Sequence, residues 1–152
     1  MQASNNCFDL IKSQEGCILH PYTDEAGIPT IGWGTTRYPD GVLVTMQDPP
    51  ITQDQADDYL ACDVKDTVNA VNAMLPSGLN QNQFDSLVDF AYNVGTGALY
   101  GSTLLKLIKV NPADPAITNA FLMWSKIHLD GRLVPSAGLL SRRKKEAALY
   151  FS

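Results

Sequence analysis

The chain has 152 residues, 45% of them hydrophobic and 18% charged, which predicts one soluble globular domain with a sizeable core. Its net charge of -5 and isoelectric point near 4.8 argue against a nucleic-acid-binding domain, because such domains are usually basic. The sequence has no run of roughly 18 apolar residues, the length that spans a bilayer, and no ordinary secretory signal. We therefore expect no stable membrane insertion.

The cysteines and histidines do not form a metal-ligand pattern. Cys7, Cys17 and Cys62 match no zinc spacing, and His20 and His128 lie far apart in the chain. We expect reduced thiols and no metal site.

The first predicted element is a helix over 4–14, with Gly16 as its stop. Residues 22–46 follow and are rich in Thr, Gly, Ile, Val and aromatic residues, with tight-turn signals such as Asp40-Gly41. This pattern predicts short strands joined by tight turns. We expect a small β lobe over about 15–50.

A long amphipathic helix is predicted next, over 52–75. Thr52 and Gln55 have the spacing of a capping box, and Pro76 ends the segment. Between them, apolar residues recur at helical spacing: Ala56, Leu60, Val64, Val68, Val71 and Leu75. A helix of this length could connect the β lobe to a helical lobe over 76–152.

The helical lobe is predicted from further start and stop signals. A helix begins near Asn80, with Gln83 three residues on, and ends at Gly95, while Ser102 caps another helix. Asp114-Pro115 begins a helix that carries Trp124, a loop contains Asp130-Gly131, and a last helix ends the chain. The fold class is α+β, mainly helical, in one domain over 1–152.

Three side chains in the N-terminal region could carry chemistry together. Glu15 stands at the predicted helix end, Asp24 follows nine residues later, and Thr30 lies six residues further on. Cleavage of a glycosidic bond needs a proton donor and a second group that stabilises charge or directs a water molecule. Glu15 could be the acid, an ionised Asp24 could stabilise the positive transition state, and the Thr30 hydroxyl could hold a water molecule. On spacing alone, two surface carboxylates are the commoner interpretation.

A longer pattern of residues changes that balance. The string Glu15-Gly16-x-x-Leu19-x-x-Tyr22-x-Asp24-x-x-Gly27-x-x-Thr30-Ile31-Gly32-x-Gly34 resembles the signature of phage lysozymes of glycoside hydrolase family 24. The similarity continues through Gln83–Gly95, Ser102–Leu105, Trp124 and Gly138–Glu146. It spans nearly the whole chain.

The resemblance implies a lysozyme-like fold, with a cleft between a small β lobe and a helical lobe joined by a long helix. It implies inverting hydrolysis of the β-1,4 bond between N-acetylmuramic acid and N-acetylglucosamine in peptidoglycan. Glu15 would be the acid, Asp24 and Thr30 would position the water, and no metal or cofactor would be needed. Thr36, Tyr92 and Thr103 would bind the sugar chain.

The same resemblance implies an endolysin for lysis of a phage host. We expect a monomer, because a cleft enzyme of this size needs no partner. We expect it in the host cytoplasm, from which it reaches the periplasmic wall after a holin permeabilises the membrane. Use as a bacterial toxin or a tail-associated lysin remains open. A sugar-binding module would have lost Glu15, Asp24 or Thr30, and a lytic transglycosylase typically lacks the second carboxylate.

Several residues have two interpretations. Packing in the core is favoured for Trp33 and Trp124 over stacking on sugar, and Tyr92 and Asn93 suit either role. Residues 101–152 carry a net charge of +5, against -10 for residues 1–100. For the basic cluster at 142–145 a solvated helix face is favoured over a polyanion-binding surface. Glu146 could form exposed pairs with the arginines, or one arginine could reach Glu15.

Overall fold

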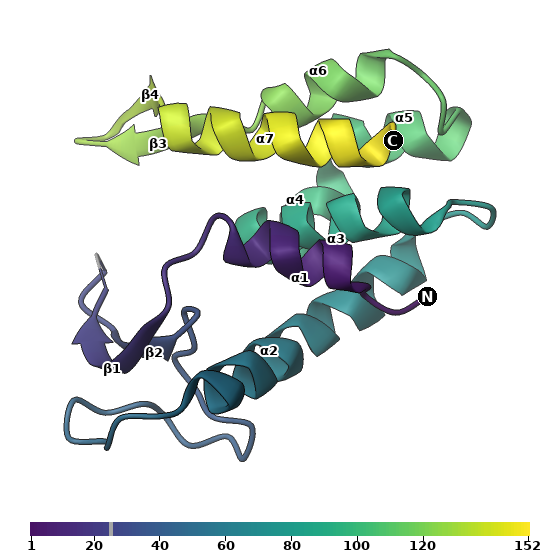
Figure 1. The fold of residues 1–152 in the computed structure, drawn as a ribbon. Helices are drawn as coiled ribbons and strands as arrows, with labels where there is room; N and C mark the ends of the chain where they lie inside the picture. Colours follow the sequence, from purple (N-terminus) through teal and green to yellow (C-terminus); the bar gives the residue numbers. More distant parts are fainter. Residues whose placement is uncertain (25) are drawn as a thin grey trace. The chain divides into compact units, whose positions relative to one another are not determined.

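The structure is a computed structural model that describes residues 1–24 and 26–152. It is α+β and mainly helical, which confirms the predicted fold class (Figure 1). Contacts divide the chain into two compact units. We call Ile11–Asp66 the β unit, and Met1–Leu10 together with Thr67–Ser152 the helical unit. The predicted single domain and its cleft stay predictions.

The sheet of the β unit is a two-stranded antiparallel hairpin. Strand β1 (Ile18–Thr23) pairs with β2 (Pro29–Gly32), and Tyr22 lies opposite Thr30. The register shifts between Ile18 and Tyr22, a segment that contains Pro21, which has no N–H to donate to the ladder. The strand thus begins earlier than the predicted strand region and is irregular just before Tyr22.

Helix α1 (Asn5–Lys12) precedes this hairpin, and helix α2 (Gln53–Met74) follows it. The predicted capping box at the start of α2 is confirmed. Thr52 Oγ1 accepts from the Gln55 N–H at 3.2 Å, and Gln55 Oε1 accepts from the Thr52 N–H at 2.9 Å. The unit boundary falls inside this helix, between Asp66 and Thr67.

Gly32, at the end of β2, approaches α2 closely. A Cβ atom at this position would lie 3.2 Å from the Cβ of Ala56, and the φ of Gly32 is +65°. Both the close contact and the left-handed backbone favour glycine. This glycine therefore lets the hairpin pack tightly against the helix.

The helical unit contains five further helices in its described residues. They are α3 (Gln81–Val94), α4 (Thr96–Gly101), α5 (Thr103–Val110), α6 (Ala116–Leu122) and α7 (Ala137–Tyr150). Figure 1 shows α7, in yellow, running alongside α3 and α6. Two predicted caps are confirmed, because Asn80 and Gln83 form a capping box and Ser102 Oγ accepts from the Leu105 N–H. The predicted N-cap at Asp114 is wrong, because Pro115 holds that position before α6 and its own side chain makes no capping hydrogen bond.

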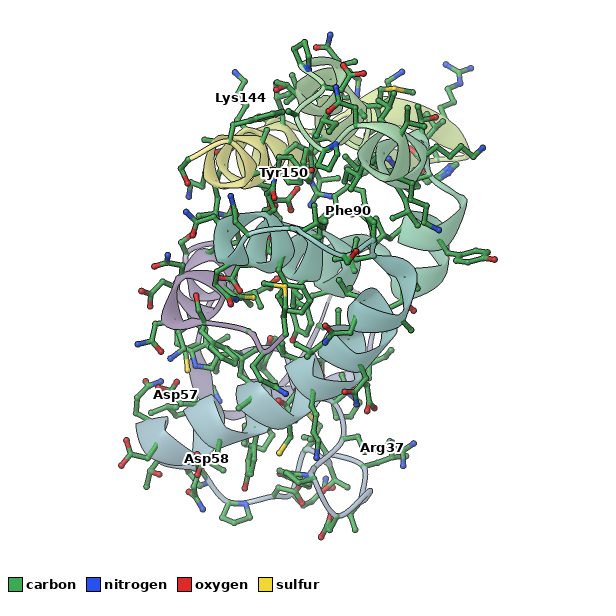
Figure 2. All side chains as sticks on the ribbon, turned by 90° about the vertical axis from the view of Figure 1, so that its right-hand side faces the viewer. Arg37, Asp57, Asp58, Phe90, Lys144 and Tyr150 are labelled. Carbon is green, nitrogen blue, oxygen red and sulfur yellow. The ribbon has the colours of Figure 1, made fainter. Side chains whose placement is uncertain are left out.

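Aromatic side chains fill the space among these helices. Phe90 packs edge-to-face against Phe121 and Trp124, with ring centroids 5.6 Å apart in each pair. Figure 2 shows Phe90 and Tyr150 among the helices, whereas Lys144 projects from α7 into solvent. None of the helices in residues 1–24 and 26–152 is long and apolar enough to cross a lipid bilayer.

A second hairpin lies where a loop was predicted. Strands β3 (Lys126–Leu129) and β4 (Arg132–Pro135) pair antiparallel, and Leu129 lies opposite Arg132. Asp130 and Gly131 form the turn with φ angles of +48° and +76°. Two positive φ angles in a two-residue connection are typical of a type I′ turn. Trp124, predicted inside a helix, lies just after the end of α6.

Candidate active site

The end of α1 fixes the backbone of Glu15. The N–H groups of Gln14 and Glu15 both donate to the carbonyl oxygen of Ile11, at 2.9 and 3.1 Å. Ile11 is fully buried, and Glu15 is half-buried. The turn that follows the last residue of α1 is therefore anchored to the core of the β unit, and Glu15 is held at a defined distance from the helix end.

Asp24 is held by the backbone of the turn between β1 and β2. Its Oδ1 accepts from the N–H groups of Ala26, at 2.9 Å, and Ile28, at 2.8 Å. Its own N–H donates to the carbonyl of Ile28 at 3.0 Å. This is the local pattern that favours aspartate in turns. The turn thus holds the carboxylate in place through one of its two oxygens.

Thr30 lies on β2 and is only 2% exposed. Its Oγ1 donates to the carbonyl oxygen of Ile28 at 2.9 Å. Because the hydroxyl proton is used in this bond, the oxygen can act only as an acceptor toward another group. The hydroxyl therefore has a defined orientation.

Tyr22 lies near both carboxylates and opposite Thr30. The pKa of its phenol is raised, mainly by burial and then by the negative charges of Asp24 and Glu15. Both carboxylates must lie near the phenol to have this effect. Thr30 lies opposite Tyr22 in the hairpin, and directly opposed side chains share one face of a sheet. The β unit therefore brings Glu15, Asp24 and Thr30 around one tyrosine.

Asp57 on α2 ties together the segments that carry these residues. Its Oδ2 lies 2.8 Å from Lys12 Nζ, and its Oδ1 accepts from Trp33 Nε1 at 2.7 Å. Lys12 Nζ also lies over the Trp33 ring, 5.4 Å from its centroid. Hydrogen bonds from Lys12 and Trp33 lower the pKa of Asp57. Trp33 thus has a structural partner, and Figure 2 labels Asp57 on α2.

Gln53 extends this cluster to the other flank of Glu15. Its Nε2 donates to Asp57 Oδ1 at 3.1 Å and lies 3.6 Å from Cys17 Sγ. The residues three before and two after Glu15 are therefore both held by the start of α2. The amino-acid sequence alone does not indicate the role of Asp57, because its partners at 12 and 33 are remote in the chain and no motif includes them.

Comparison with known proteins identifies the family. The family model described as Phage lysozyme matches residues 12–146. The chain belongs to the phage lysozyme family. It is therefore a lysozyme of the endolysin type, a hydrolase that acts on the bacterial cell wall.

Individual relatives agree with this assignment. The endolysin of Salmonella phage P22 is 36% identical over 152 residues, which span 100% of this chain and 99% of that protein. The solved structure of the endolysin from Escherichia coli O157:H7 phage FAHEc1 has a TM-score of 0.93 and 41% identity, over 100% of this chain and 94% of that one. The muramidase domain of SpmX from Asticaccaulis excentricus has a TM-score of 0.82 and 30% identity, over 99% and 98%.

The three sugar-binding residues predicted for the lysozyme lie in both units. Thr36, in the β unit, is half-buried, and its carbonyl accepts from the Val44 N–H at 3.0 Å. In the helical unit, Thr103 is the exposed first residue of α5 and borders a hollow of about 350 Å³ together with Trp124. Tyr92, on α3, is half-buried.

A second hollow of the helical unit, of about 530 Å³, is bordered by Asn93 and shares Trp124 with the first. Asn93 is exposed rather than buried, and it accepts a hydrogen bond from Arg143 at 2.6 Å. Trp124 is half-buried, so it both packs on Phe90 and faces a hollow. Among residues 1–24 and 26–152, no three His, Cys, Asp or Glu side chains are grouped as metal ligands.

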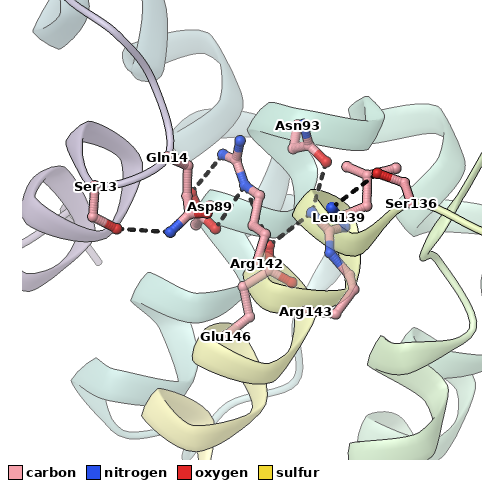
Figure 3. Close-up of polar contacts among 9 residues, drawn as sticks. All are labelled: Ser13, Gln14, Asp89, Asn93, Ser136, Leu139, Arg142, Arg143 and Glu146. Carbon is pink, nitrogen blue, oxygen red and sulfur yellow. Dashed lines mark hydrogen bonds and ion pairs between the residues drawn. The ribbon is translucent and has the colours of Figure 1, made fainter.

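A buried polar network links α3 to α7 in the lysozyme (Figure 3). Arg142 donates to both oxygens of Asp89, from Nε at 3.2 Å and from Nη2 at 2.7 Å. Arg143 Nη2 lies 3.0 Å from Glu146 Oε1. The side chains of Asp89, Arg143 and Glu146 are all 0% exposed.

These contacts correct two interpretations of the sequence. The solvated helix face is wrong for Arg142 and Arg143, which are buried, although Lys144 and Lys145 are exposed. The pairing of Glu146 with both arginines is confirmed, but its predicted exposure is wrong, because Glu146 is buried. Burial raises its pKa to about 10, with a further contribution from the neighbouring Asp89, and the two arginines oppose this shift.

Proposed function

We propose that the enzyme hydrolyses the β-1,4 bond between N-acetylmuramic acid and N-acetylglucosamine in peptidoglycan. Glu15 is the acid, and Asp24 and Thr30 position the water. The observation that carries this proposal is the convergence of Glu15, Asp24 and Thr30 on Tyr22. Membership of the phage lysozyme family supports it, as does the name of the SpmX muramidase domain.

In this proposal Glu15 donates a proton to the oxygen of the leaving sugar. A general acid must be held at a fixed place beside the scissile bond. The hydrogen bond from the Glu15 N–H to Ile11 and the contacts of Lys12 and Cys17 with the start of α2 support that role. The side chain is half-buried, so it can reach a bound sugar.

The contacts of Asp24 and Thr30 support a water-binding role. Asp24 Oδ1 is used by the turn, so we propose that Oδ2 accepts one proton of the water. Thr30 Oγ1 donates its proton to the Ile28 carbonyl and would accept the second proton of the water. A water molecule that donates both of its protons to these two oxygens has its lone pairs free. We propose that one lone pair points at the anomeric carbon of the sugar. Attack from the face opposite the leaving group inverts that carbon.

We further propose that Thr36, Tyr92 and Thr103 contact the glycan strand. The position of Thr103 at the border of a hollow with Trp124 supports this role. Substitution Thr103→Ala should raise KM on cell walls about threefold to fivefold and leave kcat unchanged, as expected when one hydrogen bond of a bound substrate is lost.

We also propose that the enzyme is a monomer that accumulates in the host cytoplasm and is released by a holin. Light scattering after size exclusion should give a mass near 16.6 kDa, and a doubled mass would count against a monomer. Expression in Escherichia coli without a holin should leave cells intact until the membrane is permeabilised with chloroform. Spontaneous lysis would reject the dependence on a holin.

The first experiment compares turbidity loss of outer-membrane-stripped Gram-negative cells for wild type, Glu15→Gln and Asp9→Asn. Asp9 is an exposed acid on α1 and is the matched control. Wild type and Asp9→Asn should clear the suspension, and Glu15→Gln, with an unchanged circular dichroism spectrum, should lose at least about 100-fold in rate. Equal clearing by Glu15→Gln would reject Glu15 as the acid.

Product analysis tests the bond and the mechanism. Hydrolysis as proposed releases a reducing N-acetylmuramic acid end whose first-formed anomer is the inverted one, which proton NMR detects early in the reaction. A reducing N-acetylglucosamine end would reject the proposed bond. A 1,6-anhydro end would instead identify a lytic transglycosylase.

A further inference from the structure

A hollow in the β unit is lined by residues other than those proposed to act in catalysis. It has a volume of about 480 Å³ and is formed by the loop around Tyr38 and the first turns of α2. Its walls include the rings of Tyr38 and Tyr59 and the polar groups of Asp40 and Gln55. None of Glu15, Asp24 and Thr30 is among its described lining residues. The volume lies within the range of small-ligand pockets.

The aromatic walls of this hollow are fixed in place. The Tyr38 hydroxyl donates to Asp48 Oδ2 at 2.8 Å, and Asp48 is itself held by the N–H and the hydroxyl of Thr45. The rings of Tyr38 and Tyr59 pack edge-to-face, with centroids 5.4 Å apart. A rigid aromatic wall loses little entropy when a ligand packs against it.

Two polar groups at the hollow keep part of their hydrogen-bonding capacity. Gln55 uses Oε1 to accept from the Thr52 N–H, which fixes its amide and orients Nε2 as a donor. Asp40 uses Oδ1 to accept from the Val42 N–H at 3.0 Å, which fixes its carboxylate as an acceptor. The hollow therefore presents one amide donor, one carboxylate acceptor and two aromatic rings.

We propose that this hollow binds an N-acetylglucosamine residue of a peptidoglycan strand, outside the catalytic site. The acetamide carbonyl accepts from Gln55 Nε2, a sugar hydroxyl donates to Asp40, and the apolar face of the ring packs on Tyr59. The described lining contains two aspartates and no basic side chain, which favours a neutral sugar over an anionic ligand. This inference rests on the proposed function.

A second sugar site would keep the enzyme on an insoluble wall between successive cleavages. A short soluble fragment that fills only the catalytic site would gain nothing from it. The site should therefore contribute to affinity for whole walls and leave turnover of short soluble fragments unchanged.

The test measures co-sedimentation with purified peptidoglycan in the Glu15→Gln background, with and without Gln55→Glu. A glutamate at 55 keeps the oxygen that accepts from the Thr52 N–H, so the capping box survives, but it removes the amide donor. Gln47→Glu is the control, because Gln47 is exposed and lies outside the described lining. Gln55→Glu should raise the Kd about fivefold to tenfold, as for a lost hydrogen bond, and Gln47→Glu should not.

A second measurement does not depend on whether the Gln55→Glu variant folds correctly. Titration of the Glu15→Gln protein with chitotetraose should shift the ring resonances of Tyr38 and Tyr59, and Tyr59→Ala should abolish the shift at Tyr38. Tyr100→Ala, which removes a 68% exposed ring on α4, should not. Equal wall affinity for Gln55→Glu and Gln47→Glu, or unshifted tyrosine resonances, overturns the inference.

Hydrolysis assays distinguish the failure of this site from the failure of the proposed function. With Glu15 intact, Gln55→Glu should slow hydrolysis of walls at low wall concentration and leave the rate on soluble glycan fragments unchanged. An equal loss on both substrates would overturn the inference. If the proposed function is wrong, wild type releases no reducing N-acetylmuramic acid ends, whereas the sedimentation comparison still measures binding at the second site.

Discussion

Two charged clusters, one in each unit, use similar residues in opposite surroundings. The Asp57 cluster is partly exposed, with 40% of the Asp57 side chain and 28% of the Lys12 side chain accessible. In the Asp89–Arg142–Arg143–Glu146 network, the side chains are 0–5% exposed. Hydrogen bonds lower the pKa of Asp57, whereas burial raises the pKa of Glu146. Access to water decides which effect is larger.

The difference separates positioning from stability. An exposed ion pair contributes little to the free energy of unfolding, because water solvates its charges well in either state. A buried pair can be nearly neutral as a whole, yet the removal of one partner leaves a charge without compensation. We therefore expect changes in the buried network to affect stability, and changes at Asp57 to affect the geometry around Glu15.

The largest effect is expected for Asp89→Ala. This change leaves the buried Arg142 guanidinium without its carboxylate and should lower the free energy of unfolding by about 3–5 kcal/mol, measured by urea denaturation. The double variant Asp89→Leu with Arg142→Met should recover most of that loss, since the guanidinium that lost its carboxylate is removed as well. If Asp89→Ala lowers the free energy of unfolding by less than about 1 kcal/mol, the buried network matters no more for stability than the exposed Asp57 cluster does.

The second effect is a dependence of stability on pH. The pKa of Glu146 in the folded protein, about 10, exceeds its ordinary value of 4.5. The associated stability is fully present below about 4.5 and is lost as the pH rises toward 10. Between pH 5 and pH 7, wild type should lose about 2–3 kcal/mol relative to Glu146→Gln, in which nothing titrates at this position. Urea denaturation measures both proteins at the two pH values. If the free energy of unfolding changes by the same amount in wild type and in Glu146→Gln, the raised pKa of Glu146 is contradicted.

The third effect concerns activity more than stability. Asp57→Ala should change the free energy of unfolding by less than about 1 kcal/mol. It should lower kcat on cell walls about fivefold to tenfold with little change in KM, because Lys12, three residues before Glu15, loses the carboxylate that holds it. The neighbouring exposed Asp58 supplies the control variant, Asp58→Ala (Figure 2). Equal activity of the two variants would show that Asp57 does not position Glu15.

The smallest effect is expected for Lys144→Ala. Lys144 is next to the buried Arg143 in the sequence but is exposed on α7. Its replacement should change the free energy of unfolding by less than about 0.5 kcal/mol. A larger loss would mean that the exposed side of α7 contributes to stability as its buried side does.

The sequence predicted the elements that local chemistry specifies. The capping boxes at Thr52 and Asn80 placed the starts of α2 and α3 correctly, since each uses side chains only three residues apart. The β3–β4 hairpin was missed although Asp130-Gly131 is a known turn signal. Both of its strands are largely exposed, so they lack the alternation of buried and exposed residues that marks a strand.

Long-range partners could not be predicted in the same way. Arg142 and Arg143 lie in a run of four basic residues, which is typical of a solvated face, and their partners Asp89 and Asn93 stand about fifty residues earlier. The three proposed catalytic residues came from a family pattern. The position of Tyr22 near them and the role of Asp57 as an anchor depend on the folded chain.

The helical unit is built from two separate segments of the chain, and this has a consequence for folding during synthesis. Its first segment, Met1–Leu10, is held by residues made much later: the amino group of Met1 donates to Asn72, the Gln81 amide donates to the Gln2 carbonyl, and Ser4 donates to Asp85. A ribosome synthesises the chain from its amino end at about 5–20 residues per second. The first ten residues must therefore wait for several seconds, while Ile11–Asp66 can already assemble their own core.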